Sequence, residues 1–128
     1  MTMSCSMRQN GDVTILDLSG RLSLGEALAF GPGSDLVLSG AIRELAQKGQ
    51  KKILLNLSKV TYVDSSGVGQ LSGALRMARS QGVELKLLSP TAQVRNLLKL
   101  TKLDTLYDIK DDEAAAIEAF SKGAAAGS

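Results

Sequence analysis

The pattern of apolar and polar residues predicts several β-strands. Residues 3–9 and 13–18 flank Asn10-Gly11, the strongest two-residue signal for a hairpin turn. Alternation along residues 13–18 predicts a half-buried strand that Gly20 ends. The apolar run Ile53–Leu57 is typical of a buried strand. After a short polar link, Val60–Val63 forms a second run rich in β-forming residues. We expect further strands at residues 83–88 and, as a short strand or extended segment, at residues 103–109.

Helical periodicity appears between these strands. The first long helix is expected to be capped by Ser34 and to stop at Gly49. Its apolar stripe is formed by Leu38, Ala41, Ile42, Leu45 and Ala46. A second helix follows Asp64 and ends near residues 81–82. A short third helix is expected to start at Ser89-Pro90, because proline suits the first helical position. Acids at residues 111–113 favour a final helix with Ala116, Ile117 and Phe120 as its buried side.

This order of elements predicts a small α/β domain. Strands that alternate with helices imply right-handed crossovers and a largely parallel sheet, which the first hairpin makes mixed. We expect one domain over residues 1–122 and a disordered tail of small residues over 123–128. Residues 21–33 read as a loop with one helical turn at most, either a tolerated insertion or a flap that faces a partner.

Composition narrows the classes of function. The chain of 128 residues has a net charge of +2 and no histidine, which removes histidine-based catalysis and zinc sites. The sequence contains no basic patch that would bind nucleic acid and no apolar run long enough to span a bilayer, and we expect no secretory signal. The sequence also lacks both common phosphate-binding motifs. Cys5 is read as inert, Tyr62 and Tyr107 as core or edge residues, and the expected location is the cytoplasm.

Residues 64–69 are the most informative segment. Asp64 and Ser65 carry side-chain oxygens that can accept hydrogen bonds from the free N–H groups of a first helical turn. Gly67 and Gly69 each cost about 1 kcal/mol relative to alanine within a helix. Either another backbone packs tightly against these glycines, or something approaches them from outside. On the residues alone, helix capping is the simpler interpretation.

Three parts of the chain resemble the STAS domain of bacterial anti-sigma factor antagonists. They are residues 17–23 (DLSGRLS), residues 53–71 with the Asp-Ser-Ser-Gly motif, and residues 82–109. The resemblance implies a STAS-like sandwich: a mixed, mostly parallel sheet of four to five strands with about four helices. In that family the motif holds a serine that a partner kinase phosphorylates, and the matching position is Ser65. Ser66 is the alternative acceptor.

The resemblance also implies a regulatory function and not an enzyme. The unphosphorylated protein would bind an anti-sigma factor that is also a serine kinase, release a sigma factor for transcription, and be switched off when Ser65 is phosphorylated. A serine phosphatase would restore it. ATP and Mg²⁺ would belong to the kinase, so no cofactor or metal is expected in this chain. We expect no direct contact with nucleic acid or membrane, and a monomer or weak dimer.

The same resemblance predicts a partner-binding surface formed by Asp64, Ser65, Ser66, Gly67, Gly69 and Ser23. Several family members carry an acid at the position of Ser23, and this departure indicates a different detail of kinase docking. Two alternatives to the antagonist remain from the sequence. One is a STAS scaffold within a signalling assembly, and the other is a module that binds a nucleotide or another small ligand.

Overall fold

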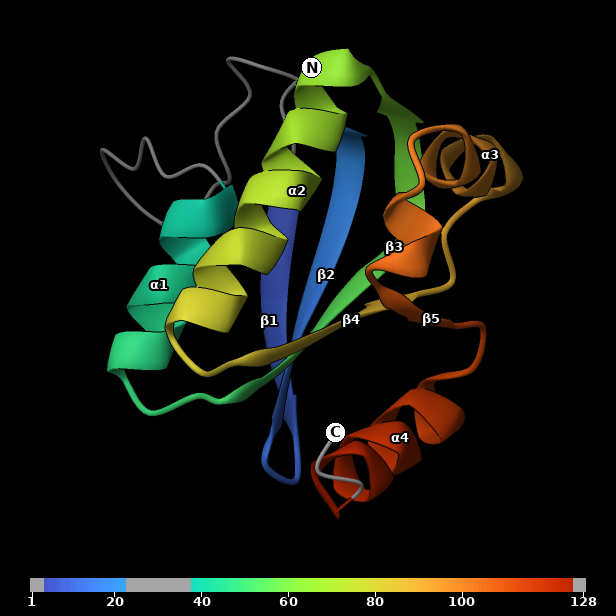
Figure 1. Cartoon of the computed structure of the whole chain (residues 1–128). Helices are drawn as coiled ribbons and strands as arrows, with labels where there is room; N and C mark the ends of the chain where they lie inside the picture. Colours follow the sequence, from blue (N-terminus) through green and yellow to red (C-terminus); the bar gives the residue numbers. More distant parts are fainter. Residues whose placement is uncertain (1–3, 23–37, 126–128) are drawn as a thin grey trace.

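A single five-stranded sheet forms the centre of the molecule (Figure 1). The structure, a computed structural model, describes residues 4–22 and 38–125. Strand β1 (Ser4–Asn10) pairs antiparallel with β2 (Val13–Leu22). Strands β3 (Lys52–Val63), β4 (Glu84–Leu88) and β5 (Asp108–Lys110) continue the sheet in parallel, in the order β1-β2-β3-β4-β5. The predicted mixed, mostly parallel α/β fold is confirmed.

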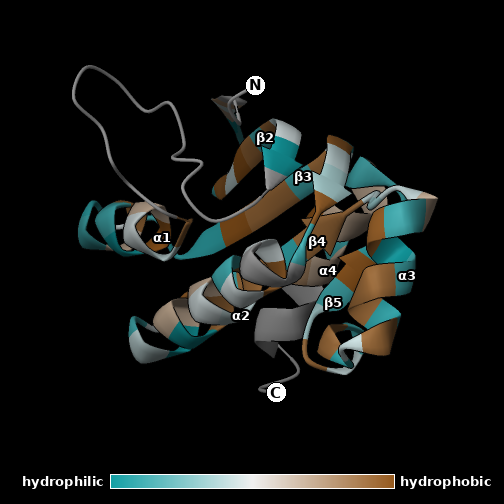
Figure 2. Ribbon diagram, turned by 90° about the horizontal axis from the view of Figure 1, so that it is seen from above, coloured by the Kyte–Doolittle hydropathy of each residue, from teal (hydrophilic) through white to brown (hydrophobic). Residues whose placement is uncertain are grey.

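Four α-helices join and cover the strands: α1 (Leu38–Gln47), α2 (Ser65–Ser80), α3 (Ala92–Leu100) and α4 (Glu113–Ala125). A short 3₁₀ turn, η1 (Leu103–Thr105), follows α3. Helices α1 and α2 lie side by side on one face of the sheet, and α4 lies apart from them (Figures 1 and 2). Residues 103–109, expected as a last strand, instead contain η1 at their start and the first two residues of β5 at their end.

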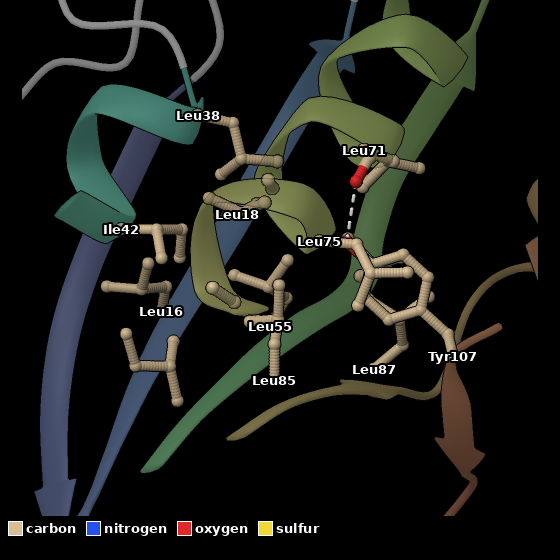
Figure 3. Packing of buried hydrophobic residues seen from close by; sticks show 14 of the residues in the cluster. Leu16, Leu18, Leu38, Ile42, Leu55, Leu71, Leu75, Leu85, Leu87 and Tyr107 are labelled. Carbon is tan, nitrogen blue, oxygen red and sulfur yellow. Dashed lines mark hydrogen bonds between the residues drawn. The ribbon is translucent and has the colours of Figure 1, made fainter. Parts of the chain in front are cut away.

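The larger hydrophobic core lies between the sheet and helices α1 and α2. The predicted stripe of α1 is fully buried there. Leu16, Leu18 and Leu55 of the sheet meet Leu38, Ile42, Leu71 and Leu75 of the helices (Figure 3). The hydroxyl of Tyr107 donates a hydrogen bond of 2.7 Å to the carbonyl oxygen of Leu71, drawn as the dashed line in Figure 3. This bond satisfies the one polar atom of a side chain that is 4% exposed.

A smaller core under α4 corrects the prediction that β2 is half-buried. Val13 and Ile15 pack with Phe120 of α4 in this second cluster, while Leu16 and Leu18 belong to the larger core. Both faces of β2 are therefore covered over its first half. A strand of this kind need not alternate, because each face packs against another element. α4 supplies the second cover, and its predicted buried side, including Phe120, is confirmed.

The first hairpin differs from the prediction in two details. The two loop residues are Gly11 and Asp12, since Asn10 still pairs with Val13. Gly11 has φ +63°, a left-handed conformation that glycine adopts without strain. Gly20 does not end β2. With φ +100° it lies beside register shifts in the pairing of β2 with β3, which is the usual role of a glycine at a β-bulge.

The start of α3 is also corrected. The hydroxyl oxygen of Thr91 accepts a hydrogen bond of 3.3 Å from the N–H of Val94, so Thr91 caps a helix that begins at Ala92. Pro90 is buried and precedes the cap, so it does not occupy the first helical position. The two runs at 53–57 and 60–63 form one continuous strand, β3.

The ends of several predicted segments need separate mention. Helix α4 runs to Ala125, so it includes the first residues of the expected tail, and the division into one domain and a tail stays a prediction. Residues 126–128, most of the predicted 21–33 loop, and Ser34 as a cap lie outside the described residues. At Gly49 the prediction is confirmed, because the N–H of Gln50 donates to the carbonyl of Leu45 and that of Gly49 to Ala46, the hydrogen bonds of a Schellman motif.

Candidate functional site at the start of helix α2

One residue separates the central strand from the helix that carries the Asp-Ser-Ser-Gly motif. Val63 ends β3, Asp64 has an extended backbone (φ −100°, ψ −174°), and Ser65 is the first helical residue. Oδ1 of Asp64 accepts a hydrogen bond of 2.8 Å from the N–H of Gly67. The carbonyl of Asp64 accepts the first helical bond, 2.9 Å, from the N–H of Val68. Asp64 is therefore the N-cap of α2, as its residue type predicts.

This cap fixes the places of both serines along the chain. Ser65 and Ser66 occupy the first two helical positions, so their backbone N–H groups lie at the positive end of the helix dipole. Their side chains lie outside what the structure describes, as does Ser23. The last residue of β2, Leu22, pairs with Val63. The ends of β2 and β3 therefore meet beside the first turn of α2, at the carboxyl edge of the parallel strands.

The two glycines of the first turns differ. Gly67 is buried, and its N–H is the group that Asp64 caps. Gly69 is exposed, and a Cβ built on it would meet no atom within 4 Å among the described residues. Packing against the described residues therefore does not account for Gly69. Close helix contact occurs one turn later, where a Cβ on Gly73 would lie 3.9 Å from Cβ of Ser39.

Sequence reasoning missed an arginine at the same end of the sheet. The guanidinium carbon of Arg21 lies 4.5 Å from the centre of the Tyr62 ring, and the two residues are paired in the parallel register of β2 and β3. The hydroxyl of Thr61 donates 3.1 Å to the carbonyl oxygen of Gly20. These contacts join residues about 40 positions apart in the chain, and only the register of the two strands could have indicated them.

A second polar cluster lies farther down the sheet. It surrounds a cavity of about 330 Å³ lined by Ser6, Arg8, Asp17, Leu18, Ser19, Asn56 and Lys59. Arg8 of β1 donates to both carboxylate oxygens of Asp17, at 2.5 and 3.0 Å, and also pairs with Glu113 of α4 at 2.8 Å. The hydrogen bonds from Arg8 hold the pKa of the Asp17 carboxyl below its ordinary value. This network joins β1, β2 and α4, and no local pattern in the sequence predicts it.

Other candidate chemistry is limited in the described part of the chain. Burial, followed by the negative charge of Asp17, raises the pKa of the Cys5 thiol to about 11, so few of these thiols ionise near neutral pH. The described side chains contain no group of three or more histidine, cysteine or acidic residues that could hold a metal ion. Over the same residues, no helix is long and apolar enough to cross a bilayer.

Comparisons with known proteins agree with this fold. A Thermotoga neapolitana protein described as an anti-sigma factor antagonist homologue is 37% identical over 75 residues, which cover 59% of this chain and 66% of the relative, just under two thirds of it. The anti-sigma F factor antagonist of Paenibacillus polymyxa is 26% identical over 117 residues, covering 91% of this chain and 94% of the relative.

Solved structures give the same assignment. The crystal structure of a Thermotoga maritima protein, also described as an anti-sigma factor antagonist, superimposes with a TM-score of 0.75 at 31% identity and covers 89% of this chain and 92% of the other. The family model of the STAS domain matches residues 4–116, a range that holds the whole sheet and the first turn of α4. The chain belongs to the STAS domain family.

Proposed function

We propose that this STAS-domain protein is an anti-sigma factor antagonist that is switched by phosphorylation of Ser65. In its unmodified form it binds an anti-sigma factor, which thereby releases its sigma factor. The names of its relatives support the antagonist function. The observation that carries the assignment to this site is the position of Ser65 directly after the cap Asp64, next to an open surface at Gly69.

The fold is expected to tolerate a phosphate at this position. Phosphorylation adds a charge of about −1.5 to −2 at neutral pH. The free N–H groups at a helix N-terminus stabilise an anion by about 0.3–1 kcal/mol. The neighbouring carboxylate of Asp64 opposes this gain: at a separation of about 6 Å in water, a charge of about −1.5 to −2 and a unit charge repel by about 1–1.4 kcal/mol. The two effects are similar in size, so the net change in stability is small.

A partner that fits the unmodified surface is expected not to tolerate the phosphate. Among the described residues nothing fills the space beside Gly69, and a partner can approach the backbone closely where no side chain stands. A charge buried there without a counter-charge costs several kcal/mol, because the phosphate loses its hydration. Phosphorylation would therefore act on the complex and not on the folding of this protein.

The partners follow from this assignment. The anti-sigma factor would itself be the serine kinase and would supply the ATP and Mg²⁺, so this chain needs no cofactor of its own and acts as a regulator, not an enzyme. A serine phosphatase would remove the phosphate. Since sigma factors act on bacterial transcription, the exchange would take place in the cytoplasm and without direct contact of this chain with DNA.

The acceptor can be identified with a pair of matched variants. The purified protein is incubated with ATP, Mg²⁺ and the anti-sigma factor kinase of the same organism, and the phosphate is located by mass spectrometry. Ser65→Ala should abolish labelling, whereas Ser66→Ala changes the neighbouring hydroxyl and should retain it. Labelling that persists in Ser65→Ala, or disappears only in Ser66→Ala, would contradict the assignment to Ser65.

A further inference from the structure

The two edges of the sheet differ in how well they are protected. Edge strand β5 has three residues, and two of them, Asp108 and Lys110, are charged and paired with each other at 3.4 Å. Short length and charge are common devices that prevent an edge from pairing with another chain. Edge strand β1 has seven residues and pairs with β2 without a register shift. It contains no proline and no lysine, and among the described residues no strand pairs with its outer side.

The one charged residue of β1 does not protect this edge. The guanidinium group of Arg8 is held by Asp17 of the neighbouring strand and by Glu113 of α4. It is therefore directed across the sheet and away from the unpaired side of β1. Its neighbour Met7 is one of the few large apolar side chains that remain exposed in the described part of the chain, with 57% of its surface accessible. An unguarded edge and an exposed methionine thus occur on the same strand.

We propose that β1 is a homodimerisation strand that pairs antiparallel with β1 of a second copy. The sequence of the strand suits such a pairing. With the two-fold axis at Met7, Met7 lies opposite Met7 of the second copy, Arg8 opposite Ser6, and Gln9 opposite Cys5. No like charges then face each other, and the two methionines cover each other. An axis at Arg8 would instead place two guanidinium groups opposite each other, which destabilises a cross-strand pair.

The pairing leaves the proposed phosphorylation site accessible. It uses the free side of β1, whereas the first turn of α2 follows the end of β3, two strands away in the sheet. It joins two sheets by main-chain hydrogen bonds, as in other complexes formed by strand addition. The dimer does not depend on the function proposed above, so either assignment can fail without the other.

Disulfide trapping tests the register directly. Directly opposite residues of antiparallel strands have Cα atoms about 4.5 or 5.5 Å apart, and Cα separations of about 4.4–6.8 Å allow a disulfide. In a Cys5→Ser background, Met7→Cys should form an intermolecular disulfide under mild oxidation. Gln9→Cys in the same background is the control, since the two cysteines would lie about 13 Å apart along the strands. With native Cys5 retained, Gln9→Cys should crosslink again, to Cys5 of the second copy, but more slowly than Met7→Cys because few Cys5 thiols ionise near neutral pH.

On non-reducing gels, Met7→Cys and the Gln9→Cys variant that retains Cys5 should both give a dimer band. The Gln9→Cys variant in the Cys5→Ser background should give at least about tenfold less crosslinked dimer. Sedimentation velocity of the wild type, over a concentration series, should show a concentration-dependent dimer that Met7→Lys weakens. Equal crosslinking of all three variants, or a wild type that stays monomeric throughout while Met7→Cys fails to crosslink, would overturn the proposal. Circular dichroism melts verify that each variant is folded.

Discussion

Removing the cap of α2 tests the local structure on which the candidate site depends. In Asp64→Ala the N–H of Gly67 loses its 2.8 Å acceptor. Gly67 is buried while Asp64 is half-buried, so water can replace the carboxylate only in part. Loss of an N-cap side chain costs about 0.5–2 kcal/mol, and this geometry favours the upper half of that range.

The expected change in melting temperature follows from the size of the domain. The entropy of unfolding is about 2.1 cal/mol/K per residue, or about 0.27 kcal/mol/K for 128 residues. A loss of 1–2 kcal/mol therefore lowers the melting temperature by about 4–7 °C. Urea denaturation at neutral pH gives the free energy directly. Asp64→Asn keeps an oxygen that can accept the same bond, so it should lie within about 0.5 kcal/mol of the wild type.

A second cap in the same molecule provides the control. Thr91 caps α3 with a longer bond of 3.3 Å and lies at the start of a different helix. Thr91→Ala should cost about 1 kcal/mol or less and should leave binding to the anti-sigma factor unchanged. An Asp64→Ala protein as stable as the wild type would refute the capping argument. So would an Asp64→Asn protein as unstable as Asp64→Ala, because the oxygen acceptor would then not be what matters.

Three further predictions concern other parts of the fold. Gly69→Ala should stabilise the protein by up to about 1 kcal/mol, since its Cβ meets no described atom, but should weaken binding of the anti-sigma factor. Gly49→Ala should instead destabilise the fold, because Gly49 has φ +90°. Urea denaturation of both variants measures the two changes in unfolding free energy. Tyr107→Phe should lose about 0.5–1.5 kcal/mol with its buried hydrogen bond, which a thermal melt detects, and an unchanged melt would contradict this bond. Because Arg8 lowers the pKa of Asp17, the stability that this pair contributes is present above the unfolded pKa of about 3.9 and is lost as the pH falls through the lower folded value. Arg8→Gln should therefore flatten the acid side of a curve of unfolding free energy against pH. A slope identical to that of the wild type would argue against the pair.

Local sequence patterns predicted those parts of the fold that local interactions determine. The apolar stripe of α1, the stop at Gly49 and the cap at Asp64 depend on residues within two turns of one another, and all three are present in the structure. The predicted start of α3 was wrong because two valid local signals favour different first residues for the helix. Proline suits a first helical position, but the threonine after it can cap the helix, and the burial of Pro90 accompanies the second choice.

Features that depend on distant residues could not be predicted. Phe120, which covers the second face of β2, lies more than a hundred positions after Val13 in the chain. The alternation in this strand therefore predicts, wrongly, that one of its faces is exposed to solvent. Arg8 meets Glu113 across 105 residues for the same reason. At the candidate site, the sequence predicts the cap and the place of Ser65 in the helix. It could not predict the open space at Gly69 or the stacking of Arg21 on Tyr62, because both depend on how strands and helices pack.

The most direct test of the proposed switch compares the unmodified protein with the protein phosphorylated at Ser65 in two assays. The first is calorimetric titration with the purified anti-sigma factor, and the second is a thermal melt of the antagonist alone. A buried uncompensated charge of several kcal/mol predicts binding weaker by at least about 100-fold, and the balance of charges at the helix N-terminus predicts a melting temperature within about 4 °C of the unmodified protein. Equal affinity of the two forms, or a phosphorylated protein that has lost its cooperative melt, would contradict a switch that acts on the complex.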